Sequence, residues 1–274
     1  MKKHSLKRIA LISLLGLATL AGGAQSANAA AKTIVVGTSG APKPYTYVND
    51  KNKITGYDIE ILRAIDKITP QYKFTYKKAE IPAVLGGVDS GRFQIGANNF
   101  GWNKARAKKY TYSKPIFNDE YVLAVRKDDN SIKNLSDISG KTTENQAGVN
   151  FTLAVQNFNK AHPKAKAKQT YTAAEEPKIL QDVQSGKYDF NLLDGPLYDS
   201  ISKQYHFTNL KAVNLKGKDV KAIGDPHSHF LTSKTAQGKA INKALNKGLV
   251  KLEKNGTLTK ISKQFFGKDY SPKA

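Results

Sequence analysis

Apolar and polar positions along the chain follow two alternating patterns. Short runs rich in apolar and β-branched residues, such as residues 33–37 and 190–193, predict strands. In residues 59–65, isoleucine and leucine recur at three-residue spacing with charged residues between them, which predicts a helix. Repetition of these β-α-β units predicts an α/β protein with mainly parallel sheets.

The same two patterns assign further elements, and residues 45–54 predict a hairpin around a turn at residues 49–52. Additional strands are expected at residues 72–76, 93–98, 116–126, 141–145, 169–171, 221–223 and 230–232. Additional helices are expected at residues 81–90, around Arg106, and at residues 149–161, 175–185, 195–205, 236–255 and 258–266. These units are too many for one sheet of ordinary width, so two α/β domains are favoured.

Residues 1–29 have the features of a secretory signal peptide that is removed from the mature protein. Four basic residues precede an apolar run over residues 9–21, and Ala27 and Ala29 are the small residues that a signal peptidase reads. The run is too short to span a bilayer comfortably, although a membrane anchor is the alternative. No later segment contains eighteen consecutive apolar residues. We therefore expect a soluble, exported protein.

The composition and charge of the chain bear on the partners that it can bind. The 274 residues include 44 Lys or Arg and 22 Asp or Glu, for a net charge of +22 that becomes +18 without residues 1–29. Only five of the basic residues are arginine, and the lysines are spread along the whole chain, which argues against nucleic-acid binding. We hypothesise that charge holds the protein at an anionic cell envelope; a merely solubilising lysine-rich surface is the alternative.

The absence of cysteine excludes several kinds of chemistry. It rules out disulfides, thiolate catalysis, cysteine-ligated zinc, iron–sulfur clusters and a lipid-anchored N-terminal cysteine. His227 and His229 could form half of a metal site, but no third ligand is nearby in the sequence, so we expect no metal and no cofactor. No carboxylate–histidine pair falls at matching strand ends, and we therefore expect no enzymatic activity.

Residues 56–61, Gly-Tyr-Asp-Ile-Glu-Ile, resemble the signature segment of the extracellular solute-binding proteins, family 3, which supply amino-acid ABC transporters. Other segments resemble that family in the same order and cover essentially the whole mature chain: residues 38–45, 106–115, 140–141, 186–194 and 256–267. The resemblance implies the type II periplasmic-binding-protein fold, in which two α/β lobes are joined by two crossover strands and the ligand binds in the cleft between them. It also implies ABC permease subunits as partners and a monomer that closes by hinge motion.

Carried onto this sequence, the resemblance assigns residues 32–119 and 226–274 to lobe 1 and residues 122–220 to lobe 2. The crossovers then fall near residues 118–121 and 220–226. The secondary-structure pattern agrees, because a new series of β-α-β units begins after Arg126.

The resemblance also implies a site for a free amino acid. Arg106 occupies the family's position for the ligand carboxylate, which a guanidinium can bind through two parallel hydrogen bonds. Val149 and Asn150 precede or begin a helix whose free N–H groups attract an anion; a plain capped helix is the alternative. Asp194 follows a strand and matches the carboxylate that binds the ligand ammonium. Its alternative role is to cap the next helix.

Other residues are expected to line the site and select the ligand. Asn98, Asn99 and Gly101 follow a predicted strand and resemble the lining segment of lobe 1, although Asn99 could be a turn residue. Ser39 stands where relatives that bind cationic side chains have an acidic residue. Apolar or aromatic walls are offered by Ile81, Phe100, Trp102 and Tyr45.

The segment over residues 98–100 and the run after Arg106 look most like the cystine-binding branch of the family. L-Cystine is therefore the leading ligand, and other polar or dicarboxylic amino acids are the alternatives. A different class of function also stays open, because a basic surface protein could act as an adhesin that binds host matrix or acidic glycans, as a second role or instead of transport.

Overall fold

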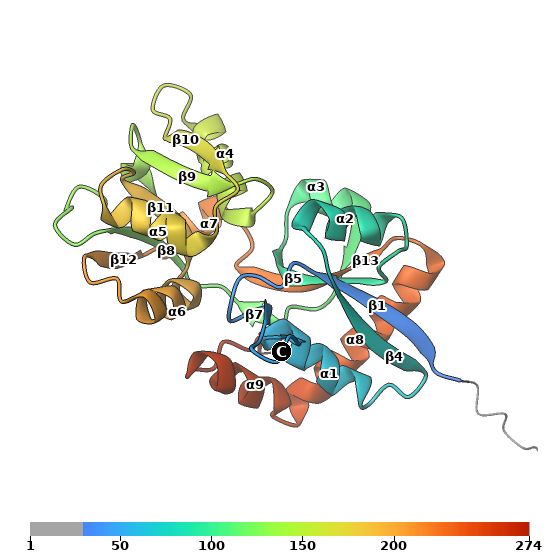
Figure 1. Ribbon diagram of the computed structural model, residues 1–274. Coiled ribbons are helices and arrows are strands. Elements are labelled where there is room, and N and C mark those ends of the chain that lie inside the picture. The colour runs from blue at the N-terminus through green and yellow to red at the C-terminus, as the bar shows by residue number, and fades with distance from the viewer. Residues whose placement is uncertain (1–29, 274) are drawn as a thin grey trace, which may run out of the picture. The chain divides into compact units, whose positions relative to one another are not determined.

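A computed structural model describes residues 30–273 (Figure 1). The predicted signal peptide, residues 1–29, lies outside the described residues, so that prediction is not tested. Within residues 30–273, no helix is both long enough and apolar enough to cross a membrane.

Strands and helices alternate along most of the described chain. The strands are β1 (Lys32–Thr38), β2 (Tyr47–Val48), β3 (Ile54–Thr55), β4 (Tyr72–Lys78), β5 (Ile95–Gly101), β6 (Tyr110–Tyr112), β7 (Phe117–Asn118), β8 (Tyr121–Arg126), β9 (Thr142–Gln146), β10 (Lys168–Thr172), β11 (Phe190–Asp194), β12 (Leu210–Asn214) and β13 (His227–Ser233). The helices are α1 (Tyr57–Asp66), α2 (Ile81–Asp89), α3 (Lys104–Lys109), α4 (Asn150–Ala161), α5 (Glu176–Gln184), α6 (Gly195–Tyr205), α7 (Lys218–Ile223), α8 (Ala236–Lys254) and α9 (Thr257–Phe266), with a 3₁₀ turn at Leu135–Ile138.

The first sheet has the strand order β4-β1-β5-β13-β6, with β7 also paired to β13. We call this sheet and its helices α1, α2, α3, α8 and α9 lobe 1 (Figure 1). Helix α2 packs on one face and α1 and α8 on the other, so both faces of β1 are covered: Ile34 and Val36 belong to the core on the α1 side, and Val35 packs with the α2 cluster. This alternation follows from the two-residue period of a strand.

The second group, which we call lobe 2, contains β8 to β12 and α4 to α7. Strand β8 lies between β11 and β12 and is antiparallel to both, while β9 and β10 form a separate parallel pair. In β8, Val122 and Ala124 enter one hydrophobic cluster and Leu123 and Val125 enter another. Because both faces of β8 are buried, its sequence is a continuous apolar run instead of an alternating one.

Several expected elements need correction. Residues 221–223 form the end of helix α7 and not a strand, because a run of three residues is too short for its apolar pattern to distinguish the two. The expected strand at residues 116–126 is broken at residues 119–120 into β7 and β8. The sheets are mixed and not mainly parallel, since β8 and β13 each pair antiparallel with their neighbours. The hairpin at residues 45–54 is confirmed by the pairing of β2 with β3.

An aromatic cluster underlies the break between β7 and β8. Phe117 lies 5.1 Å from Tyr45, 5.4 Å from Tyr57 and 4.9 Å from Phe266, measured between ring centroids. Tyr45, Tyr57 and Phe117 are fully buried. The cluster therefore fixes β7, and with it the start of the break, against α1 and α9 of lobe 1.

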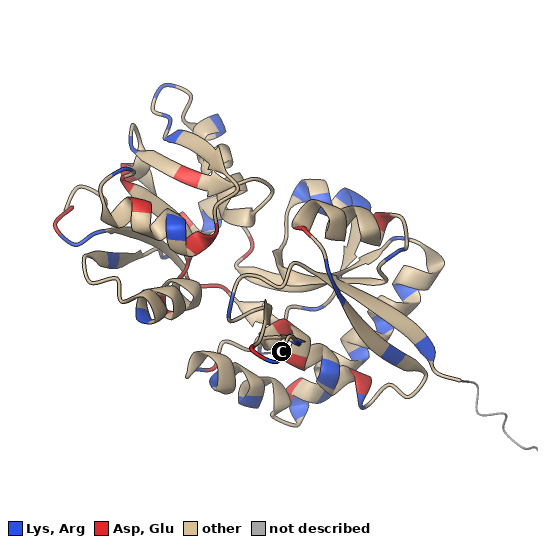
Figure 2. Ribbon diagram, in the orientation of Figure 1, with Lys and Arg blue, Asp and Glu red and all other residues tan. Residues whose placement is uncertain are grey.

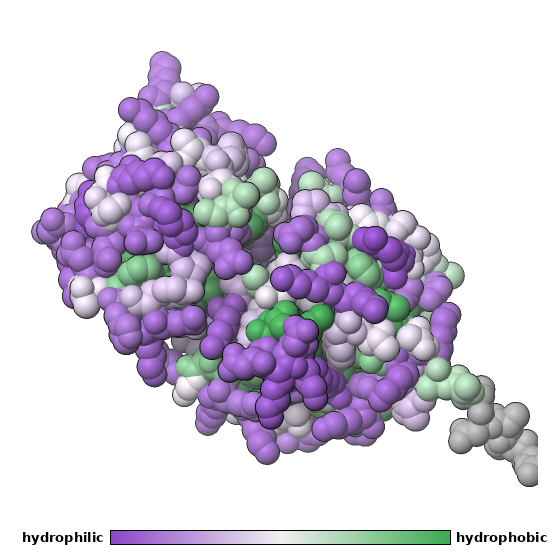
Figure 3. Space-filling view, viewed as in Figure 1, coloured by the Kyte–Doolittle hydropathy of each residue, from purple (hydrophilic) through white to green (hydrophobic). Residues whose placement is uncertain are grey.

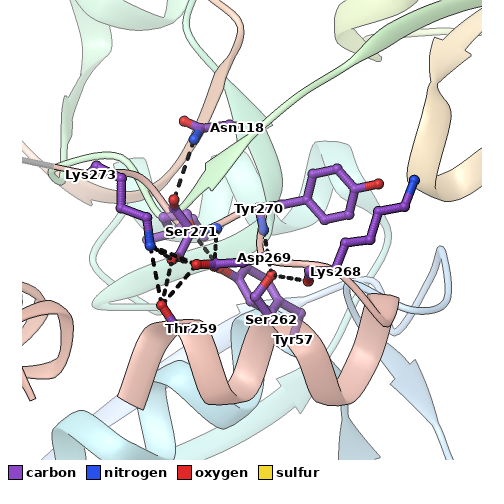
Figure 4. Close-up of polar contacts among 10 residues, drawn as sticks. Tyr57, Asn118, Thr259, Ser262, Lys268, Asp269, Tyr270, Ser271 and Lys273 are labelled. Carbon is purple, nitrogen blue, oxygen red and sulfur yellow. Dashed lines mark hydrogen bonds and ion pairs between the residues drawn. The ribbon is translucent and has the colours of Figure 1, made fainter. Parts of the chain in front are cut away.

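The C-terminal segment is hydrogen-bonded to Asn118, the last residue of β7 (Figure 4). The Asn118 backbone N–H donates to the Tyr270 carbonyl at 2.9 Å, and the Asn118 side chain donates to the Ser271 carbonyl at 3.4 Å. Asp269 holds this segment on α9: its carboxylate accepts from the Thr259 hydroxyl at 2.9 Å and from the Lys273 ammonium at 2.6 Å. The segment from Asp269 to Lys273, which we call the C-terminal clasp, therefore links residue 118 to α9 through hydrogen bonds.

We expect Asp269→Ala to lower the free energy of unfolding at pH 7 by about 1–3 kcal/mol, because several hydrogen bonds to a charged acceptor are lost. Burial acts to raise the pKa of the Asp269 carboxyl, but hydrogen bonds from Lys273, Ser271 and Thr259 outweigh it and hold the pKa well below its usual range. A carboxyl whose pKa is lowered on folding stabilises the fold at pH values above its unfolded pKa of about 4. This contribution to the free energy of unfolding declines as the pH falls from about 4 through the folded pKa.

The measurement is urea unfolding of Asp269→Ala and of the wild type at pH 7 and at lower pH. Asp128→Ala is the matched control, because that side chain is 80% exposed and its nearest ion-pair distance, to Arg126, is 4.0 Å. An effect of Asp269→Ala no larger than that of the control would contradict the clasp.

Basic residues are spread over both lobes (Figure 2). They include a stripe of exposed lysines at four-residue spacing on α8, made of Lys239, Lys243, Lys247 and Lys251. Hydrophilic residues cover most of the face seen in Figure 3, with smaller apolar areas between them. Association with an anionic envelope stays a prediction that this distribution does not test.

Candidate ligand-binding site

Arg106 lies on α3 and its side chain is buried, with 8% of the residue exposed. Asn103 caps the helix by accepting the Arg106 backbone N–H at 2.8 Å. The guanidinium donates to the Gly101 carbonyl at 3.2 Å, to the Asn150 Oδ1 at 2.6 Å and to the Gly148 carbonyl at 2.6 Å. All of these acceptors are neutral.

The Arg106 charge therefore has no counter-charge among residues 30–273, where none of the ion pairs includes it. Burial lowers the pKa of the guanidinium from its usual value, which reflects the cost of keeping the charge away from water. The Phe100 ring, 5.2 Å from the guanidinium carbon, offers only a weak cation–π contact. An anion that replaced one of the neutral acceptors would remove most of this cost.

The predicted lobe 2 residues lie against Arg106. Asn150 begins α4, and Val149 at its N-cap position makes no side-chain capping bond, so the first turn keeps N–H groups that no side chain caps. Gly101 allows the close approach, because a Cβ there would come within 2.2 Å of the Asn150 Nδ2. The structure thus brings Arg106, Gly101, Val149 and Asn150 together at the N-terminus of α4, where an anion is favoured.

Asp194 ends β11 and is fully buried. Its Oδ1 accepts the Tyr45 hydroxyl from lobe 1 and the Leu197 backbone N–H at 2.9 Å, so Asp194 does cap α6. Its Oδ2 has no hydrogen-bond partner among the described residues. Because capping uses one oxygen and leaves the other, the two roles that the sequence left open are compatible in this geometry.

Burial raises the pKa of Asp194 to about 6, although the hydrogen bonds from Tyr45 and Leu197 act in the opposite direction. A buried carboxylate gains stability from a cation placed at its free oxygen. Asp194 therefore has the electrostatic properties expected of an acceptor for a ligand ammonium.

Three further carboxyls, none of them among the predicted site residues, belong to this region: Asp119 and Glu176 are influenced by the charge of Asp194, and Asp58 acts on Asp119. Burial raises the pKa of Asp58 to about 7. Burial, followed by the charge of Asp194, raises the pKa of Glu176 to about 8 and that of Asp119 well above its usual range. Asp58 is part of the signature segment, and Asp119 interrupts an apolar run; both signals were visible in the sequence but did not indicate burial.

Asn98 and Ser39 are brought together as supports of the first loop. The Asn98 Oδ1 accepts the Ser39 backbone N–H at 2.8 Å and the Thr38 hydroxyl at 3.1 Å, and its Nδ2 donates to the Ala41 carbonyl at 3.0 Å. With its amide used inside the protein, Asn98 positions the loop between β1 and β2.

Asn99 has a left-handed backbone with φ of 47° and donates its N–H to the Asp58 Oδ2 at 2.7 Å. Its side chain hydrogen-bonds Asp119. The turn conformation that the sequence left open for Asn99 is therefore present, and it directs the residue toward the carboxyls.

The predicted apolar walls are only partly exposed. Phe100 is 2% exposed and lies in a cluster with Val84 and Val88, and Ile81 packs against that cluster. Trp102 is 46% exposed. Phe100 and Ile81 therefore pack with the lobe 1 cluster, whereas the Trp102 side chain is accessible to solvent.

The histidines do not form a metal site in the described chain. His227 pairs with Asp225, and the His229 Nδ1 lies 2.8 Å from the Ser113 carbonyl. No group of three or more His, Cys, Asp or Glu among residues 30–273 is arranged to hold a metal ion.

A small cavity of about 40 Å³ borders the site and is lined by residues of both lobes, among them Gly101, Asn150 and Tyr121. A larger cavity of about 280 Å³ between α4 and α7 contains none of the predicted site residues. The candidate site is therefore suggested by its charges and not by its volume.

Comparison with known proteins places this geometry in a family. The model of the bacterial extracellular solute-binding proteins, family 3, matches residues 34–268. The L-cystine-binding protein TcyJ of Bacillus subtilis is 30% identical over 97% of this chain and 97% of its own length. The L-cystine-binding protein TcyA of the same organism is 30% identical over 87% of this chain and 82% of its own length.

A solved structure from work on glutathione import via GshT and the cystine ABC importer TcyBC of Streptococcus mutans is also similar. It has a TM-score of 0.81 and 35% sequence identity, and the match covers 89% of this chain and 98% of that chain. The expected type II periplasmic-binding-protein fold is confirmed. These matches over nearly the whole described chain show that it belongs to the bacterial extracellular solute-binding proteins, family 3.

Proposed function

We propose that this protein captures L-cystine in the site between its lobes and delivers it to an ABC importer. The observation that carries the proposal is a pair of uncompensated buried charges on opposite lobes. Arg106 has only neutral acceptors, and Asp194 has a free Oδ2. An amino acid carries a carboxylate and an ammonium and would compensate both.

Binding then proceeds by exchange of partners. The ligand carboxylate takes the place of the Asn150 and Gly148 acceptors at the Arg106 guanidinium, and the first turn of α4 supplies further N–H groups. The ligand ammonium donates to the Asp194 Oδ2, while the Tyr45 hydroxyl stays on Oδ1. Because the two charges belong to different lobes, ligand binding favours the closed arrangement in an open–closed equilibrium.

L-Cystine is proposed because the relatives at 30% identity are described as L-cystine-binding proteins. Glutathione is a second candidate, because the structure at 35% identity comes from work on glutathione import. Both compounds contain an α-amino acid end that Arg106 and Asp194 can bind. None of the relatives named above is described as an enzyme or an adhesin, so we propose neither of these functions.

A thermal-shift panel tests the proposal. We expect L-cystine, present at a hundred times its Kd, to raise the free energy of unfolding by about 2.7 kcal/mol. The panel contains the twenty amino acids, L-cystine, and reduced and oxidised glutathione. A shift with glutathione alone would replace cystine as the ligand, and no shift with any compound would overturn the transport function.

The single tryptophan, Trp102, provides an independent readout, because it is half-exposed and follows Gly101 at the site. Its fluorescence should change on titration with the same compound that gives the thermal shift. A thermal shift without saturable fluorescence change would argue that the compound binds elsewhere.

A further inference from the structure

We infer that Asp119 forms a second ammonium subsite beside Asp194, so that the preferred ligand carries two amino groups. This inference rests on the proposed function and specifies its ligand class. A compound made of two amino acids joined through their side chains, such as L-cystine, belongs to that class; an amino acid with a single amino group does not.

Asp119 occupies a fixed position between the lobes. It lies in the break between β7 and β8, and its backbone N–H donates to the Pro226 carbonyl at 2.7 Å, which joins the first connection between the lobes to the second. The Asn99 side chain hydrogen-bonds the Asp119 carboxyl. The buried Asp119 Oδ1 has no hydrogen-bond partner among the described residues.

The surroundings of Asp119 supply acceptors and negative charge but no cation. Buried oxygens without a donor are present on Asp119, Asp194, Asp58 and Asn99. Asp194 and Asp58 are fully buried, so these oxygens cannot be satisfied by bulk water. None of the ion pairs within residues 30–273 includes Asp58, Asp119, Asp194 or Glu176.

A single ammonium cannot satisfy this arrangement. It carries one charge and three N–H donors, whereas four buried acceptor atoms, on Asp58, Asn99, Asp119 and Asp194, have no hydrogen-bond partner among the described residues. An amino group on Asp194 alone would leave the Asp119 carboxyl protonated, because burial and Asp194 raise its pKa, and would leave its Oδ1 without a partner. Arg106 does not compensate Asp119, because its guanidinium is directed to Gly101, Gly148 and Asn150. A second ammonium at Asp119 completes the charge balance.

The test compares two ligands that differ by one amino group: L-cystine, and the mixed disulfide of L-cysteine with 3-mercaptopropionate. Calorimetric titration of the wild type should give an affinity about ten- to a hundredfold higher for L-cystine, as expected for one hydrogen-bonded charged group. Asp119→Asn should lose about the same factor for L-cystine and bind the mixed disulfide with nearly unchanged affinity. Asn preserves the shape of the side chain and removes a buried charge, so the variant should fold.

Glu120→Gln is the matched control, because this neighbouring carboxyl is exposed and its loss should change neither affinity. Equal wild-type affinities for the two compounds would overturn the second subsite. An equal loss for both compounds in Asp119→Asn would also overturn it, since Asp119 would then share one ammonium with Asp194 or act only through the fold. Failure of the proposed function is distinguishable, because in that case neither compound binds the wild type.

Discussion

Arg106→Ala should weaken ligand binding by about 30- to 4000-fold. The substitution leaves the ligand carboxylate desolvated without its charged partner, at a cost of about 2–5 kcal/mol, and about 1.4 kcal/mol corresponds to a tenfold change in Kd. Among the described residues the Arg106 guanidinium is held by the Gly101, Gly148 and Asn150 oxygens and has no acidic partner. We therefore propose the ligand carboxylate as its counter-charge.

Calorimetric titration with the compound selected by the thermal-shift panel measures this loss. Arg106→Lys should recover only part of the affinity, because an ammonium lacks the planar fork that binds a carboxylate through two hydrogen bonds. Arg92→Ala is the matched control: its side chain is exposed, stacks on Phe93 and donates to the Ala83 carbonyl. Wild-type affinity in Arg106→Ala would show that the carboxylate binds elsewhere, and a variant that does not fold would show that Arg106 is structural.

Asp194→Asn should weaken ligand binding by a similar factor, because a neutral amide cannot compensate the charge of the ligand ammonium. The fold should tolerate the change. An asparagine oxygen can still accept the Tyr45 hydroxyl and the Leu197 N–H, which keeps the cap of α6. Asp128→Asn, also on lobe 2 and 80% exposed, is the matched control.

The pH dependence of binding gives a second readout for Asp194. Its pKa of about 6 in the free protein, raised by burial, means that the carboxyl must lose its proton before it can pair with an ammonium. Affinity should therefore fall by up to about tenfold per pH unit below about 6. Asp119, Glu176, Asp199 and the Tyr45 hydroxyl act on the same carboxyl, so Asp194→Asn should reduce this dependence without removing all of it.

The stability of the ligand-free protein should change with pH in the opposite direction. A carboxyl whose pKa is raised on folding stabilises the fold below its unfolded pKa of about 4, and this contribution is lost as the pH rises through the folded pKa. For Asp194 the window therefore runs from about 4 to about 6. Urea unfolding across this window should show a smaller decline for Asp194→Asn; parallel curves for the variant and the wild type would contradict the raised pKa.

The sequence by itself predicted most of the elements and the two principal charges of the candidate site. Periodicity located most helices and strands because burial of one face imposes a period of 3.6 or 2 on any element long enough to show it. Arg106 and Asp194 could be named because each stands in a motif that resembles the family's, and these motifs follow one another in the family's order. The same reasoning failed for residues 221–223, where three residues carry too little pattern to separate the end of α7 from a strand.

Only the tertiary structure decided which charges lack a partner. The Tyr45 hydroxyl reaches Asp194 across 149 positions of sequence, and Arg106 reaches Asn150 across 44. Asp58 and Asp119 look like ordinary surface acids in the sequence, and their importance arises from burial next to another carboxyl. Desolvation and charge proximity depend on distances in space that no local pattern encodes, so the carboxyls around Asp194 could be recognised only in the folded chain.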